Sequence, residues 1–179
     1  MSKNKRVWSL PLRCLHWLLV AGVAAAWFTS SRTGIAHETI GYGVAAVVLA
    51  RVVLGFGGGR YARFAQFVRG PRHTLRYAAD VLKSRAPRYV GHNPLGGWMV
   101  LALIAVIAAV TLSGWIATTD EFWGYAWPVR LHVALAWTLV LLVACHVAGV
   151  VLTSWQHAEN LVGAMLTGSK AEARPGDVD

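Results

Sequence analysis

Four long apolar runs constrain the fold of this chain more than any other feature. They cover residues 12–31, 39–56, 95–118 and 129–155. Each is long enough to cross a bilayer as an α-helix, since about 20 apolar residues suffice. A sequence that is 56% hydrophobic, with only eight acidic residues in 179, excludes an ordinary soluble domain. We therefore predict an all-α integral membrane protein, in which residues 1–168 form one four-helix bundle of up-down-up-down order and residues 169–179 form a disordered tail.

Basic residues indicate how these spans are oriented. Lysines and arginines concentrate before the first run, in the long connection 57–93 and in the tail, whereas the other two connections carry only Arg32 and Arg130. Because cytoplasmic loops of membrane proteins are enriched in these residues, both termini and the long connection are predicted to be cytoplasmic, in a bacterial inner membrane. The net charge of +9 follows from this distribution, so a nucleic-acid partner is not predicted.

The long connection is predicted to contain structure of its own. Two of its stretches, YARFAQFVRG and RHTLRYAADVLKSR, combine aromatic and basic residues. This composition predicts short amphipathic helices on the cytoplasmic membrane surface. Asn93 followed by Pro94 is a typical start for the helix of the third span. Residues 156–166 predict a further short surface helix after the fourth span.

Four histidines fall within or beside the apolar runs. His132 and His146 stand fourteen residues apart in the fourth run, so they share one face of a helix and lie about 21 Å apart along its axis. That separation is most of a hydrocarbon core of about 30 Å, which places one ring near each side of the membrane. With the predicted orientation, only one pairing matches in depth: His16 with His146 on the cytoplasmic side, and His37 with His132 on the periplasmic side.

Paired imidazoles at two depths indicate two haem groups. A neutral imidazole is a good axial ligand of haem iron, and a second one fills the remaining axial position, which suits electron transfer. The sequence has no C-x-x-C-H attachment motif, so non-covalent haem b is predicted. The alternative is that each ring only hydrogen-bonds to a neighbouring helix, because a polar side chain in hydrocarbon needs a partner. A four-histidine zinc site is excluded by the distance between the two levels.

Other polar residues near these levels are candidates for contacts with the same cofactors. Arg13 and Arg51 are placed for the propionates of the cytoplasmic haem, and Arg32 and Arg130 for those of the periplasmic haem. The alternative for each arginine is an extended side chain that reaches the lipid headgroups. His157, just after the fourth run, is a candidate contact for a quinone or a propionate, or else an interfacial residue. No catalytic residue is predicted.

Several segments of the chain resemble the bacterial cytochrome b-561 and nickel–iron-hydrogenase-type cytochrome b family. They are RCLHWLL, AHETIGY, GHNPLGGWMVLALI, LHVALAWTLVLLVACHVAG and HAENLVGAMLTG, which together extend over nearly the whole chain to about residue 168. The resemblance implies a four-helix membrane cytochrome with two haem b groups, one bound by His16 and His146 and the other by His37 and His132. Hydrogenase-linked members have a fifth span, which is not found here, so the resemblance is to the shorter members.

The resemblance also implies a function. Such proteins move electrons between the membrane quinone pool and a redox partner, with quinone as an exchangeable substrate and a periplasmic c-type cytochrome as the expected partner. An alternative is a superoxide:quinone oxidoreductase, which would need a cationic funnel for a small anion. The only periplasmic cations predicted for such a funnel are Arg32 and Arg130. A third reading of the sequence is a non-redox helical channel or assembly protein.

Overall fold

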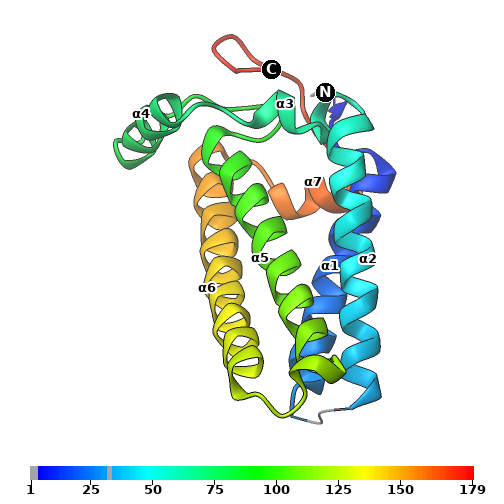
Figure 1. Cartoon of the computed structure of the whole chain (residues 1–179). Helices are drawn as coiled ribbons and strands as arrows, with labels where there is room; N and C mark the ends of the chain where they lie inside the picture. Colours follow the sequence, from blue (N-terminus) through cyan, green and yellow to red (C-terminus); the bar gives the residue numbers. More distant parts are fainter. Residues whose placement is uncertain (1–3, 32–33) are drawn as a thin grey trace.

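Four apolar helices make up most of the protein. The computed structural model describes residues 4–31 and 34–179. The helices long and apolar enough to cross a membrane are α1 (Leu10–Thr29), α2 (Ile35–Gly57), α5 (Pro94–Thr118) and α6 (Ala126–His157). They stand side by side and alternate in direction (Figure 1). The predicted all-α membrane bundle is therefore confirmed, and each predicted span bound lies within about one helical turn of the observed one.

The bundle has two different ends. At the capped end, as we name it, lie residues 4–9, 58–93 and 158–179, so that the first described residues and the C-terminus lie on the same side (Figure 1). At the open end, α1 and α5 finish and α2 and α6 begin, and η2 (Asp120–Phe122) is the short helical turn described there. Almost all of the chain outside the spans therefore covers one side of the bundle.

The spans pack in the order α1, α2, α5 and α6. Gly22 lets α1 approach α2 closely, because a Cβ atom at this position would lie 2.7 Å from Val44. In the middle of the bundle, Val44 and Val48 of α2 pack with Ile107 of α5 and Leu139 of α6. This apolar cluster separates the two levels at which polar side chains enter the bundle.

Short helices build the capped end. The predicted amphipathic segments of the connection contain η1 (Arg60–Ala62), α3 (Phe64–Phe67) and α4 (Pro71–Leu82). The predicted start of the third span is also observed, since the Asn93 side chain accepts a 2.7 Å hydrogen bond from the Gly96 N–H. The helix predicted over 156–166 is shorter, because α6 continues to His157 and α7 (Leu161–Thr167) begins only after a break at Ala158.

The polar composition of residues 169–179 predicts a disordered tail, and the structure differs from this prediction. β2 (Ser169–Ala171) pairs antiparallel with β1 (Asn4–Arg6), and Val178 forms a bridge with Tyr89. Ion pairs hold the same segment: Asp177 with Arg88, Lys170 with Glu159 at 3.0 Å, and Asp179 with Lys5. The partners of Asp177 and Asp179 lie 89 and 174 residues away in the sequence, so the composition of the tail alone does not indicate these contacts.

Candidate functional site: two histidine pairs

The structure brings the four candidate histidines together in two pairs. His16 of α1 faces His146 of α6, with ring centroids 6.4 Å apart. His37 of α2 faces His132 of α6, with ring centroids 6.0 Å apart. His16 lies near the start of α1 and His146 in the second half of α6, toward the capped end, whereas His37 and His132 lie near the starts of α2 and α6, toward the open end. One long helix, α6, thus supplies one ring at each level.

The spacing within each pair suits one metal ion held between two imidazoles. Two rings that each bind a shared ion through a bond of about 2 Å place their centroids about 6 Å apart. Across the described ranges, no group of three or more His, Cys, Asp or Glu side chains could hold a bare metal ion. A structural zinc site needs four protein ligands, so two histidines are too few for it. Haem iron needs only two, because the porphyrin supplies the other four nitrogens.

The open-end pair has a defined hydrogen-bonding state. Nδ1 of His37 lies 3.0 Å from the carbonyl oxygen of Ala26 in α1, and Nδ1 of His132 lies 3.0 Å from that of Val110 in α5. A carbonyl oxygen only accepts, so each Nδ1 carries the proton and each Nε2 keeps a free lone pair. This second contact orients a metal-binding histidine and raises its basicity. Nε2 is therefore the nitrogen through which either ring could bind a metal ion.

Gly114 makes room for one of these rings. A Cβ atom at this position of α5 would lie 3.0 Å from Cε1 and 3.2 Å from Nδ1 of His132. That is closer than ordinary van der Waals contact, so a larger residue would press on the imidazole. The absence of a side chain here keeps His132 in the position from which it contacts Val110.

Buried cationic and polar groups lie near the capped-end pair. Arg51 of α2 is 6% exposed and stacks on Phe64, with its Cζ 5.2 Å from the ring centroid. Arg13, one turn before His16 in α1, donates to the Leu166 carbonyl oxygen. His92, between Trp8 and Phe67, was not identified as a site residue from the sequence. Burial, and then the charges of Arg51 and Lys170, lower the pKa of His92 to about 3. Its ring is therefore neutral at neutral pH.

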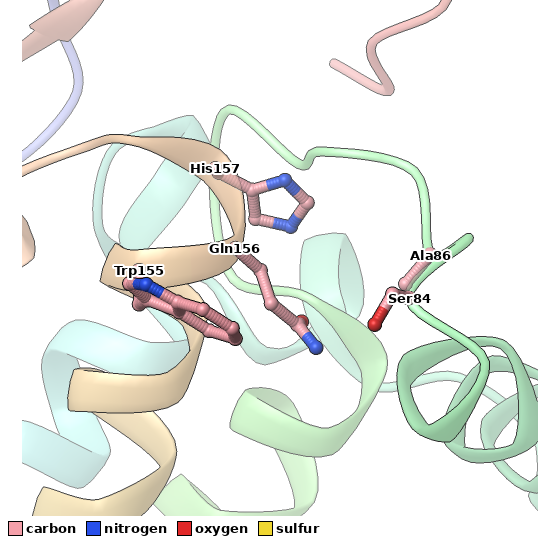
Figure 2. Close-up of a pocket in the computed structure, with 5 residues that line it drawn as sticks. All are labelled: Ser84, Ala86, Trp155, Gln156 and His157. Atoms are coloured by element: carbon pink, nitrogen blue, oxygen red, sulfur yellow. The ribbon is translucent and has the colours of Figure 1, made fainter.

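The remaining candidates are spread over both ends. Arg130 is exposed at the open end, two residues before His132, and Arg32 lies outside the described residues. His157 lines a cavity of about 270 Å³ at the capped end, together with Ser84, Ala86, Trp155 and Gln156. Gln156 and Ser84 face each other across this space (Figure 2). The cavity thus offers an imidazole, an amide and a hydroxyl beside an indole ring.

Comparison with known families decides the class of this chain. Residues 7–168 match the family model described as prokaryotic cytochrome b561. The chain belongs to this family. No curated protein and no solved structure matches it. Family membership implies a membrane-bound b-type cytochrome that binds haem b and takes part in electron transfer. The resemblance found in the sequence is therefore confirmed.

Proposed function

We propose that this cytochrome b561 carries two haem b groups and transfers electrons across the bacterial inner membrane, between the quinone pool and a periplasmic redox partner such as a c-type cytochrome. One observation carries the proposal: two histidine pairs, with rings 6.4 and 6.0 Å apart, are joined by a single helix. His16 and His146 would hold one haem, and His37 and His132 the other. Their levels are about 21 Å apart along α6, so electrons could pass between them.

The chain itself performs three tasks in this mechanism. The haem groups, when bound, supply one-electron redox chemistry. Each pair of histidines would hold one haem iron, and two imidazoles per iron would favour electron transfer over oxygen binding. Backbone carbonyls of Ala26 and Val110 hold the Nδ1 protons of His37 and His132, so these rings stay neutral and oriented. The apolar cluster between the levels keeps water out of the bundle.

Charge supports a cytoplasmic location for the capped end. The connection 57–93 carries most of the basic residues between the spans, and the N-terminus and tail add more. The start of α6 at the open end carries Arg130, and Glu38, Asp120 and Glu121 lie on the same side. By the positive-inside rule, the capped end then faces the cytoplasm and the open end the periplasm. The haem held by His37 and His132 would be the one near the periplasmic partner.

The cavity at His157 is our proposed site for the quinone head group. A quinone presents two carbonyl oxygens, and the His157 ring and the Ser84 hydroxyl can donate hydrogen bonds to them. Trp155 beside them offers a flat apolar surface at the membrane interface. We expect His157→Ala to slow reduction of the haems by a quinol at least tenfold, while dithionite still reduces them fully. His73→Ala, at an exposed histidine of α4, is the matched control; equal rates in both variants would refute the site.

The proposal is tested by counting haem in the purified chain. We expect two haems per chain that are extracted by acid-acetone, together with low-spin six-coordinate bands in a reduced-minus-oxidised spectrum. One haem would refute the two-site arrangement. A folded preparation without any haem would refute the proposal and would mean that the four histidines only pack between the helices.

A further inference from the structure

Unsatisfied buried polar atoms gather at one end of the bundle. In the described part of the chain, the buried side-chain nitrogen and oxygen atoms without a hydrogen-bond partner are Nε of Arg13, Nη1 of Arg51, Oε1 of Gln66 and Nδ1 of His92. All four belong to the capped end or to the parts of α1 and α2 that adjoin it. Buried polar groups are normally paired, so such a group of exceptions needs an explanation.

The charges of this region do not balance. Arg51 is almost fully buried, and within residues 4–31 and 34–179 neither it nor Arg13 forms an ion pair with a carboxylate. The nearby acids serve other cations, since Glu159 and Asp177 pair with Arg88. An uncompensated buried charge is strongly unfavourable. The buried Arg51 therefore requires a negative charge that the described residues do not supply, and the half-buried Arg13 leaves its buried Nε without an acceptor.

The location relates these groups to the capped-end histidines. Arg13 precedes His16 by three residues in α1, so both side chains lie on the same helix face. His92 stacks against Trp8 and Phe67, with ring centroids 4.7 and 4.6 Å apart. Trp8 in turn lies close to Arg13, because a Cβ atom at Gly168 would lie 2.8 Å from the Trp8 carbonyl oxygen and 3.1 Å from Arg13 Nε. The neutral ring of His92 carries one N–H, which it can donate to an anion. Arg51 is connected to the same group through aromatic contacts, since Phe64 stacks on both Arg51 and Phe67, and Phe67 stacks on His92. The three donors thus lie in one connected region next to the turn of α1 that carries His16.

We propose that Arg51, Arg13 and His92 form a carboxylate-binding cradle for the two propionates of the haem held by His16 and His146. This inference rests on the proposed function and adds His92, from the GHNP segment, to the cofactor site. The two guanidinium charges match the two carboxylates, and N–H groups at Arg51 Nη1, Arg13 Nε and His92 Nδ1 are free to donate to them. The propionates of this haem would then lie under the cover of the capped end.

The test compares variants of the full, haem-loaded chain. Arg51→Gln removes the charge, His92→Phe keeps an aromatic ring between Trp8 and Phe67, and Arg63→Gln removes an exposed charge from the same connection as the control. We measure the midpoint potential and occupancy of each haem by redox titration in detergent. A buried cation favours the reduced haem, so Arg51→Gln should shift one haem about tenfold toward the oxidised form, or about 59 mV for one electron.

His92→Phe should lower the occupancy of that same haem several-fold, and the second haem should be unchanged in both variants. Repeating the titration with His132→Ala identifies the affected haem as the one bound by His16 and His146. Arg51→Lys keeps the positive charge, so its midpoint potential should equal that of the parent chain. This comparison remains available even if Arg51→Gln folds poorly. Midpoints and occupancies equal to those of Arg63→Gln would overturn the cradle.

Two further outcomes separate this inference from its alternatives. If the unpaired arginines bind a lipid phosphate rather than haem carboxylates, removal of lipid should expose the Arg51 charge and raise the midpoint potential of the parent chain but not that of Arg51→Gln, and this would overturn the assignment to the haem. If the unmodified protein carries two haems but the variants change neither, the cradle fails and the proposed function stands. If the unmodified protein carries no haem, the proposed function itself fails.

Discussion

The two ends of the bundle build their histidine pairs in different ways. At the open end, both rings are held by backbone carbonyls of neighbouring spans, those of Ala26 and Val110. At the capped end, neither His16 nor His146 has a hydrogen-bond partner among the residues described, and the unpaired polar groups on this side include His92 and Gln66 from outside the spans. The hydrogen-bond partners of the open-end rings thus come from the spans themselves. The polar groups at the capped end come partly from segments that fold over the spans.

This difference has an electronic consequence. A hydrogen bond from Nδ1 to a carbonyl makes the histidine a stronger donor, which favours oxidised iron and lowers the midpoint potential. Buried cations such as Arg51 favour the reduced form and raise it. We therefore expect the haem at the open end to have the lower potential of the two.

The largest expected effect is the loss of one haem at a chosen end. His132→Ala should leave one haem per chain, held by His16 and His146, and His146→Ala should leave the one held by His37 and His132. The haem that remains in His132→Ala should have the higher midpoint potential. Haem counting and redox titration of the two variants check this. Two haems retained at full occupancy in either variant would show that the histidines are paired differently.

A smaller change should disturb the open end alone. Gly114→Ala places a methyl group 3.0 Å from the His132 ring, and overpacking of this kind typically costs about 1–3 kcal/mol. We expect the open-end haem to bind at least about fivefold more weakly, with the capped-end haem unaffected, as measured by haem occupancy and by the low-spin spectrum. The control is Gly43→Ala in α2, where a Cβ atom meets nothing within 4 Å. Equal loss in both variants would mean that Gly114 is not a spacer for His132.

The same contrast explains what could be predicted from the sequence. Hydropathy marked the four spans because lipid imposes long apolar helices, and the fourteen-residue spacing of His132 and His146 placed one ring at each level. The capped end was not predictable in this way. Arg88 pairs with Glu159 and Asp177, which are 71 and 89 residues away. No local sequence pattern indicates ion pairs between residues so far apart. For His92, the only signal was its position in the GHNP segment before a helix start.

Breaking the ion pairs of the capped end should leave the open end intact. Arg88 lies 2.6 Å from Glu159, and both side chains are about nine-tenths buried. Glu159→Gln should destabilise the capped end by about 3 kcal/mol, the lower end of the cost of breaking a buried pair. Hydrogen exchange of the segment 158–179, compared with that of α5, measures the effect. Equal exchange in the variant and the parent chain would mean that these charges do not hold the tail.

The pH dependence of this cap follows from the same carboxylate. Burial alone would raise the pKa of Glu159, but hydrogen bonds from Arg88 and Lys170 outweigh it and lower the pKa. A carboxylate with a lowered pKa contributes stability above its ordinary pKa of about 4.3, and this stability is lost as the pH falls through the lowered value. The cap should therefore loosen in acid below about pH 4 in the parent chain. Glu159→Gln should show a weaker dependence over that range.

The smallest expected effect is a gain in stability where α6 joins the cap. Ala158 ends α6 with φ of 49°, in the left-handed region, which costs an L-residue roughly 1–2 kcal/mol and glycine nothing. Because glycine also loses more entropy on folding, Ala158→Gly should gain about 1 kcal/mol or less. Ala79→Gly, at an exposed position inside α4, should instead lose about 1 kcal/mol. Thermal unfolding in detergent distinguishes the two, and a loss in both variants would mean that the turn at Ala158 carries no strain.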